Sequence, residues 1–292
     1  MKKPSIVLCN HGSFIDFIFA GKLLYKNDFN FITARLYFYH KLLGSTLKNI
    51  GCFPKSMFAS DLESTKNCMR VLAEGRVLAM MPEARLSTVG VFEDIQSNTH
   101  SFLKKSAVPI YTICFKGDYF ANPKWGNGCR RGAIVEAELD LLLSAEQVKK
   151  MSADEIEAKV TERLYYNEFE WLESRPEIRY KNRKLAEGLE NILSICPKCQ
   201  KSHTIKTKGK KIYCEECGYL TELDERYQFV NEFCFKNFAE WYNWQKAEIA
   251  KKIDQDENFS LSSPVTLRHS DQTGKNLTRF AGEGVCTLPI EG

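Results

Sequence analysis

A histidine and an aspartate lie five positions apart near the start of the chain, in the run Cys9-Asn10-His11-Gly12-Ser13-Phe14-Ile15-Asp16. The apolar residues 6–9 predict a short buried strand, and the spacing of Ser13 and Asp16 is typical of a capping box that opens a helix. His11 would then lie in the strand-to-helix turn, close to Asp16. An aspartate beside a histidine fixes the tautomer and stabilises the imidazolium, so the pair predicts a general base. The alternative is that Asp16 only caps the helix and His11 is an ordinary loop residue.

Three further stretches could supply parts of the same site. Residues 51–55 form a tight turn that leads to a cation, Lys55. Residues 81–90 follow a predicted strand directly and contain Glu83 and Arg85. Residues 108–110, Val-Pro-Ile, place a proline where a strand begins. Taken singly, these stretches are explained by a turn, a surface ion pair and a strand end.

Short apolar runs alternate with helical patterns between residue 5 and about residue 140. We predict strands at 6–9, 29–33, 77–81, 108–114 and 133–139, and helices at 14–24 and 35–43. A charged helical pattern continues from 144 to about 193. Strands separated by helices favour an α/β sheet, in which ligands lie in loops at the carboxyl ends of the strands. His11 and the segment after Met81 both fall in such loops.

Together, and in this order, the four stretches resemble the glycerolipid acyltransferase family, also called lysophospholipid or PlsC-like acyltransferases. The resemblance covers roughly residues 4–140. His11 and Asp16 match the His-x4-Asp motif of the family, Glu83 matches the glutamate of its Pro-Glu-Gly block, and 108–110 match its last block. Ala84 replaces the glycine of that block and Arg85 comes one place early, which is more similar to the branch that acts on 2-acylglycerophosphoethanolamine.

The resemblance implies a mixed sheet flanked by helices and an O-acyltransferase of phospholipid biosynthesis. The fatty acyl group would move from acyl-CoA or acyl-carrier protein to the free hydroxyl of 1-acylglycerol-3-phosphate. His11 would be the general base and Asp16 its orienting partner. Lys55 and Arg85 would bind the acceptor phosphate, and Glu83 would bind an acceptor hydroxyl or order Arg85. Glycerol-3-phosphate and 2-acylglycerophosphoethanolamine are the alternative acceptors.

Two Cys-x-x-Cys pairs, Cys196/Cys199 and Cys214/Cys217, are separated by fourteen residues. Two such pairs at this distance are typical of a zinc ribbon with a closed, structural Cys₄ zinc site. A redox dithiol is the competing interpretation. Lysines 206, 208, 210 and 211 would form a basic hairpin tip, which is either a solvated turn or a contact for anionic lipid or nucleic acid.

The composition is that of an ordinary folded protein, with 43% hydrophobic and 27% charged residues and a net charge of +4. No apolar run approaches a membrane span, the first run is too short for a signal peptide, and the cysteines do not form a secreted disulfide pattern. We therefore expect a cytoplasmic protein, peripherally associated with the inner face of the membrane.

Changes in composition and periodicity along the sequence predict four parts. These are an acyltransferase domain with C-terminal helices at 1–193, a zinc ribbon at 194–222, a helical segment at 223–254 and the beginning of a β-rich segment at 255–292. The last part and the short segment before His11 lead us to expect a piece of a longer chain. The rival function is a zinc-ribbon module that binds nucleic acid or protein on an inactive acyltransferase-like scaffold. The modest net charge and the lack of basic patches interleaved with aromatic residues argue against nucleic acid.

Overall fold

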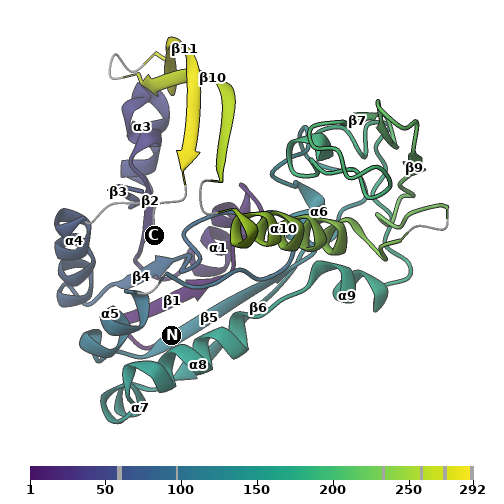
Figure 1. Cartoon of the computed structure of the whole chain (residues 1–292). Coiled ribbons are helices and arrows are strands. Elements are labelled where there is room, and N and C mark those ends of the chain that lie inside the picture. Colours follow the sequence, from purple (N-terminus) through teal and green to yellow (C-terminus); the bar gives the residue numbers. More distant parts are fainter. Residues whose placement is uncertain (58–60, 97, 232–233, 257–258, 272–274, 290–292) are drawn as a thin grey trace. The chain divides into compact units, whose positions relative to one another are not determined.

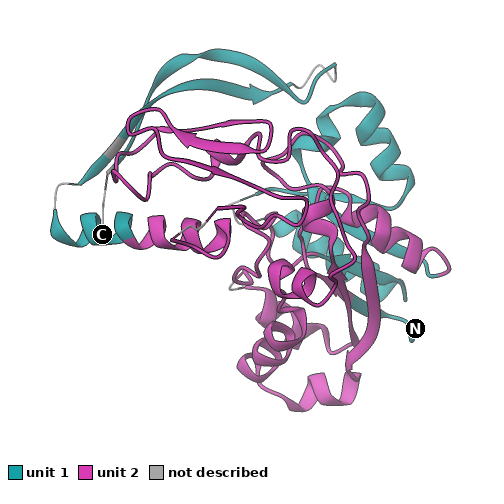
Figure 2. Ribbon diagram, turned by 90° about the vertical axis from the view of Figure 1, so that its right-hand side faces the viewer, with its two compact units in different colours: residues 1–6, 27–80, 248–292 teal, residues 7–26, 81–247 magenta. Residues whose placement is uncertain are grey.

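The structure is a computed structural model that describes residues 1–57, 61–96, 98–231, 234–256, 259–271 and 275–289. Parts of the predicted segments 223–254 and 255–292 thus lie outside the described residues. The chain divides into two compact units, coloured separately in Figure 2. Unit 1 contains residues 1–6, 27–80 and 248–292, and unit 2 contains residues 7–26 and 81–247.

The largest sheet is mixed, with its six strands in the order β3-β2-β4-β1-β5-β6 (Figure 1). Its strands are β1 (Ser5–Cys9), β2 (Phe29–Ala34), β3 (Phe53–Lys55), β4 (Val77–Met80), β5 (Ile110–Lys116) and β6 (Glu136–Leu143). The five predicted strands correspond to β1, β2, β4, β5 and β6, and Pro109 immediately precedes β5 as predicted. The α/β class with a mixed sheet and flanking helices is therefore confirmed.

In unit 1, β2 pairs in parallel with β3 and with β4. Its helices are α2 (Leu36–Tyr39), α3 (Lys41–Asn49) and α4 (Leu62–Ala73), and α4 packs against β3 and β4. The predicted helix 35–43 is interrupted at His40, whose extended backbone and Nδ1, which accepts from the Leu43 N–H, start α3 anew. The strands β10 (Ser260–Ser270) and β11 (Thr278–Pro289) form an antiparallel hairpin.

In unit 2, β5 pairs antiparallel with β6, and the short α6 (Asp118–Ala121) follows β5. The helix α8 (Ala153–Leu164) packs against both strands, and α5 (Thr99–Ser106) packs against α7 (Ala145–Lys150) and α8. A complete capping box opens α8 at Ser152, and its buried side chains are Ile156, Val160 and Leu164, as the sequence predicts. The remaining helices that lie in or reach into this unit are α1 (Asp16–Leu24), α9 (Glu168–Glu173) and α10 (Phe238–Gln255).

The predicted helical pattern to residue 193 is wrong beyond α9. Residues 174–188 form no helix, and residues 189–193 contain only a single 3-10 turn, η1 (Leu189–Asn191). Pro176 cannot donate a helical hydrogen bond, and Gly188 has a left-handed φ of 105°. The segment is instead fixed by burying Tyr180 and Leu185 in the core.

The core of unit 2 is rich in aromatic rings and includes the cysteine region. Phe120 stacks on Tyr227 at 4.5 Å between ring centroids and meets Phe169 edge-on at 5.0 Å. The same cluster contains Cys196 and Cys214. The cysteine region contains the three-stranded sheet β7 (Ile205–Lys208), β8 (Lys211–Cys214) and β9 (Leu220–Glu222), with one cysteine pair in the segment before β7 and the other at the end of β8. Among the described residues, no helix has the length and apolar character that a membrane crossing requires.

Candidate active site and metal centre

The turn that carries His11 is anchored by the residue before it. The Asn10 amide is buried and forms a reciprocal pair with the backbone of Phe115, donating to its carbonyl at 2.9 Å and accepting from its N–H at 2.7 Å. The His11 carbonyl accepts from the Ser87 N–H at 2.9 Å. The backbone on both sides of the imidazole is therefore held by β5 and by the loop after β4.

His11 and Asp16 lie together as predicted. His11 Nδ1 is 3.1 Å from Asp16 Oδ2, which also accepts from the Ser13 N–H at 2.8 Å. Asp16 is fully buried, whereas the His11 side chain is 22% exposed. Only half of the predicted capping box forms, because the Asp16 N–H donates to the Ser13 carbonyl and the Ser13 hydroxyl accepts from the Ile15 N–H instead. A neutral imidazole with its proton on Nδ1 can donate to Asp16, and Nε2 is then the nitrogen that can accept a proton.

The electrostatic environment favours a neutral imidazole. Burial, followed by the positive charge of Lys124, lowers the pKa of His11 to about 4. Burial raises the pKa of Asp16 to about 8, although hydrogen bonds with the Ser13 N–H and with Asp118 oppose this shift. A histidine that is neutral at pH 7 has the protonation state that a general base requires.

Glu83 is fully buried and holds the site together. Its Oε1 accepts from the His11 N–H at 3.0 Å, and its Oε2 accepts from the Glu93 N–H at 3.3 Å and from the Tyr166 hydroxyl at 3.5 Å. Burial raises its pKa to about 7. Both carboxylate oxygens are thus engaged by protein groups, and one of those groups is the backbone of His11.

Arg85 is half-exposed and its Nε lies 2.6 Å from Glu93 Oε2. The backbone N–H of Glu93 is in turn bound by Glu83, so Glu83 reaches the arginine only through Glu93. Lys55 is the last residue of β3 in unit 1, where its carbonyl accepts from the Arg35 N–H at 2.9 Å. Its proposed contact with the acceptor remains a prediction from the sequence.

Two buried acids of this site are not apparent in the sequence motifs. Asp118, the first residue of α6, and Glu168, the first residue of α9, are both fully buried. Glu168 accepts from the Gly117 N–H with both oxygens, at 2.9 and 2.8 Å. The available signal was an acidic residue inside the aromatic run 115–120, but nothing in the sequence relates that run to His11. Lys124 was missed for the same reason.

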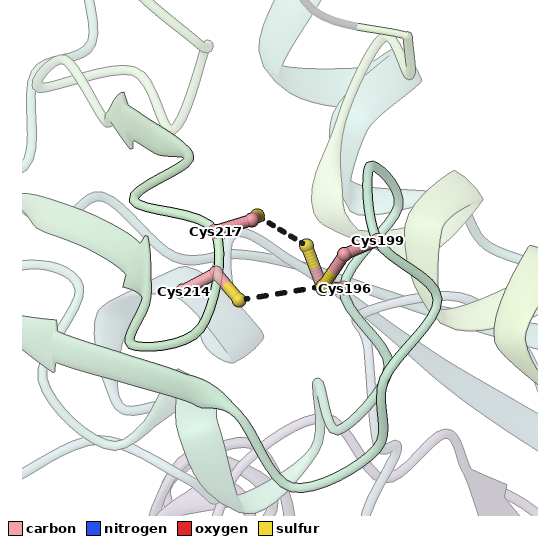
Figure 3. A group of neighbouring side chains, drawn as sticks. All are labelled: Cys196, Cys199, Cys214 and Cys217. Atoms are coloured by element: carbon pink, nitrogen blue, oxygen red, sulfur yellow. Dashed lines mark hydrogen bonds between the residues drawn. The ribbon is translucent and has the colours of Figure 1, made fainter.

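The four paired cysteines converge on one point in the structure (Figure 3). Cys196 Sγ lies 3.7 Å from Cys217 Sγ, and Cys199 Sγ lies 3.7 Å from Cys214 Sγ. Four sulfurs at 2.3 Å from a tetrahedral zinc ion would be separated by about 3.8 Å. The spacing of the sulfurs therefore fits a zinc ion.

The backbone around the cysteines has the form of two metal-binding turns. The Gln200 N–H donates to the Cys196 carbonyl at 2.9 Å, and the Gly218 N–H donates to the Cys214 carbonyl at 3.0 Å. Although burial acts in the opposite direction, hydrogen bonds with the Thr204 hydroxyl and with backbone N–H groups lower the pKa of Cys214, whereas burial raises the pKa of its neighbour Cys196. A thiolate is the form that binds metal. Four such ligands leave no open position for catalysis.

Comparisons with known proteins bear on the first part of the chain. Residues 1–116 match the family model described as Acyltransferase, and this segment contains His11, Asp16, Lys55, Glu83 and Arg85. The match supports the acyltransferase that the motifs predict. The cysteine region lies outside the matched segment.

One matching solved structure is the 1-acyl-sn-glycerophosphate (LPA) acyltransferase PlsC from Thermotoga maritima. It shares 19% sequence identity with a TM-score of 0.41, and the match covers 55% of this chain and 62% of that one. No curated protein matches the chain in sequence.

Proposed function

We propose that the protein is a glycerolipid O-acyltransferase in which His11 is the general base. The observation that carries the proposal is the 3.1 Å contact between His11 Nδ1 and the buried Asp16 carboxylate, at the end of β1 and inside the segment that matches the Acyltransferase family model. The hydroxyl acceptor would be 1-acylglycerol-3-phosphate, and the donor a thioester, acyl-CoA or acyl-carrier protein.

The reaction needs one proton to be moved twice. His11 Nε2 would take the proton from the acceptor hydroxyl as that oxygen attacks the thioester carbonyl and forms the new C–O bond. The Asp16 carboxylate would stabilise the imidazolium through Nδ1–H. When the C–S bond breaks, the imidazolium would return the proton to the departing thiolate, which restores the neutral histidine. General-base catalysis of this kind commonly contributes about 10²–10⁴-fold.

Basic side chains would hold the phosphate of the acceptor. Arg85 is half-exposed and is held by Glu93, which fixes its guanidinium close to the Glu83 loop. Lys124 is exposed, and its positive charge contributes to lowering the pKa of His11. We assign these two residues to the phosphate, and a phosphate contact of Lys55 stays a prediction from the sequence.

The helix that carries Asp16 also presents an apolar surface. Phe14, just before α1, and Phe17 and Ile18 in α1 are 50%, 42% and 55% exposed, and Lys22 in α1 and Lys26 just after it are exposed as well. We name these three apolar residues the α1 apolar face. Exposed apolar side chains flanked by lysines suit a surface of anionic lipid, from which a lysophospholipid could reach His11. This supports the proposed peripheral association with the inner face of the cytoplasmic membrane.

The cysteine cluster is proposed to hold a structural zinc ion. Its sulfurs fit the ion and are joined to the aromatic core of unit 2, so bound zinc would stabilise that core. Two of the four tip lysines lie near carboxylates, Lys206 by Glu215 at 3.9 Å and Lys210 by Glu225 at 3.8 Å. This pairing lowers the local positive charge and counts against a nucleic-acid-binding tip.

The test is transfer of a labelled acyl group to lysophosphatidic acid, glycerol-3-phosphate and 2-acylglycerophosphoethanolamine, from acyl-CoA and from acyl-carrier protein. The wild type is compared with His11→Ala and with the matched control His203→Asn, an exposed histidine in the cysteine region. We expect turnover in the wild type and the control and a loss of at least ~10²-fold in His11→Ala. Equal turnover in all three proteins would refute the assignment of the base.

A further inference from the structure

A second buried carboxyl group lies directly behind the His11–Asp16 pair. Asp118 is fully buried at the start of α6, and it lies against the backbone of Gly12, the residue that links His11 to Ser13. A Cβ atom added to Gly12 would be 2.3 Å from Asp118 Oδ2. A side chain at position 12 would therefore require the Asp118 carboxyl group to move away from the turn that carries the histidine.

Asp16 and Asp118 can form a hydrogen bond with each other only if one of the two carboxyl groups carries a proton. Asp16 Oδ1 and both oxygens of Asp118 are buried, and no donor among the described residues forms a hydrogen bond with them. The two side chains are nevertheless hydrogen-bonding neighbours. Two carboxylates have no proton to donate to each other, and two adjacent negative charges in a buried site repel strongly. One shared proton removes the repulsion and satisfies the unpartnered oxygens.

The proton belongs on Asp118 rather than on Asp16. Asp16 Oδ2 already accepts from the Ser13 N–H and faces His11 Nδ1, and both contacts stabilise a carboxylate. Among the described residues, no other residue donates to the oxygens of Asp118, only its own backbone N–H opposes the rise of its pKa, and its other neighbour is Glu168, a further carboxyl group. The donor–acceptor order that satisfies most atoms is therefore Asp118 O–H to Asp16 Oδ1.

We propose that Asp118 is a positioning residue for the His11–Asp16 pair: its protonated carboxyl group donates to Asp16 Oδ1 and holds Asp16 Oδ2 toward the imidazole. The proposal deepens the proposed acyl transfer and rests on it for its effect on turnover. The proton of Asp118 stays in place during the reaction. Only the proton of the acceptor hydroxyl moves, first to His11 Nε2 and then to the leaving thiolate.

The groups around Asp118 agree with this assignment. Burial, followed by the charge of Asp16, raises the pKa of Asp118 well above its usual value, and burial does the same for Glu168. The titratable groups that act on Asp118 or are affected by it are Asp16 from α1, Glu83 from the loop after β4, Tyr166 and Glu168 from the segment at α9, and Tyr180. None of them is a cation that would favour an ionised Asp118.

Two substitutions of Asp118 separate the donated proton from the volume of the side chain. Asp118→Asn keeps an N–H donor toward Asp16 without any charge, and Asp118→Leu keeps a similar volume without a donor. Asp154→Asn, at an exposed aspartate of α8, is the matched control. Thermal unfolding and metal content are measured for every variant, together with kcat and KM for the acceptor across pH.

We expect Asp118→Asn to keep kcat within about 3-fold of the wild type with the same pH profile. In Asp118→Leu, kcat should fall by ~10-fold or more while KM stays within about 2-fold, because the acceptor does not touch Asp118. If Asp118→Asn loses as much kcat as Asp16→Asn, an ionised Asp118 is required and the proposal is overturned. Equal kcat in Asp118→Leu and the wild type also overturns it.

A measurement without turnover keeps the inference independent of the proposed reaction. In protein labelled with ¹³C at the aspartate carboxyl carbons, the signal that disappears in Asp118→Asn should lie at the position of a protonated carboxyl group at pH 9, above the pKa of about 8 of Asp16. An ionised position overturns the proposal, whether or not Asp118→Leu folds. If the wild type transfers no acyl group to any acceptor, the proposed function fails. The positioning role is then supported by a protonated Asp118 together with a His11 Nδ1–H signal that is kept in Asp118→Asn and lost in Asp118→Leu.

Discussion

The acidic site around His11 and the four-cysteine cluster bury polar groups in the same unit, but they resolve this burial in opposite ways. In the cysteine cluster, each Sγ has a sulfur neighbour at 3.7 Å, and backbone N–H groups favour the thiolate of Cys214. Around His11, burial raises the pKa of Asp16 to about 8 and that of Glu83 to about 7.

The difference teaches what each region is built for. A closed set of four ligands gains stability from its ion and offers nothing to a substrate. Carboxyl groups whose pKa is raised by folding lower the stability of the folded state at neutral pH, because the unfolded chain loses their protons more readily than the folded protein does. Such unfavourable burial is typical of sites that perform chemistry, where the stability of the fold is traded for a defined protonation state.

The largest effect that we expect comes from removing the metal. Cys199→Ser, or a strong chelator, should lower the free energy of unfolding by at least ~4 kcal/mol and the unfolding temperature by about 10 °C or more, because the cysteine region shares the aromatic core of unit 2. Calorimetry with metal analysis checks this, and Cys129→Ser, at an exposed cysteine, is the control. Unchanged unfolding after full metal loss would remove the structural role from the comparison.

Asp16→Asn should have the next largest effect, on turnover. We expect kcat to fall ~10²-fold with little change in metal content, because the imidazolium loses its negative partner. The active form has a neutral His11 and an ionised Asp16. With the pKa of His11 lowered to about 4 and that of Asp16 raised to about 8, it is the aspartate that gains a proton first as the pH falls.

The kcat of the wild type should therefore decrease as the pH falls through about 8, and Asp16→Asn should lack this limb. The measurement is kcat from pH 5 to pH 9 for both proteins. A limb near the ordinary histidine pKa of about 6.5 that persists in Asp16→Asn would contradict the electrostatics of the site.

The same acids make a weaker prediction for stability. Asp16 and Glu83 have raised pKa values in the folded state, about 8 and about 7. Between about pH 4 and these values, the folded protein therefore still holds protons that the unfolded chain has already released. The stability that these two acids contribute should accordingly be highest below their unfolded pKa values and should fall as the pH rises to about 8, whereas His11, with its pKa lowered to about 4, opposes this trend up to its unfolded pKa of about 6.5. Denaturant unfolding from pH 5 to pH 8 checks the slope, which should be shallower in Asp16→Asn.

Arg85→Met should raise KM for the acceptor by about 10-fold, corresponding to ~1.4 kcal/mol, while kcat changes little. The half-exposed guanidinium is screened by solvent, so a larger change is not expected. Arg85→Lys should recover part of the affinity. An acceptor without a phosphate should show the same KM with the wild type and Arg85→Met, and a difference there would argue against phosphate recognition.

The smallest expected effect concerns the α1 apolar face. Replacing Phe17 and Ile18 with serine should reduce binding to anionic phospholipid vesicles by about 5-fold. Both side chains are exposed, so they add to the free energy of membrane binding only where they enter the lipid. Vesicle sedimentation measures the binding, with Leu220→Ser, an exposed residue of β9, as control. Equal binding by the wild type and the double variant would place the lipid contact elsewhere.

The sequence alone determined those parts of the protein whose residues are close together in the chain. The alternation of apolar runs predicted five strands of the sheet, because a strand or helix is recognised from its local period. His11 and Asp16 are joined by one turn, and each cysteine pair spans one turn, so spacing was enough to bring their side chains together. The continuation of the helical pattern to residue 193 was wrong, because packing of Tyr180 and Leu185 into the core overrode a charged pattern.

Only the tertiary structure decided what surrounds His11. The carboxyl groups of Glu83, Asp118 and Glu168 come from segments far apart in the chain, and no local spacing relates them to the turn. Their effect depends on burial and on distance, since desolvation, nearby charges and hydrogen bonds each change the pKa of a carboxyl group. The sequence therefore identified the base and its partner, and the fold decided the electrostatic environment in which they lie.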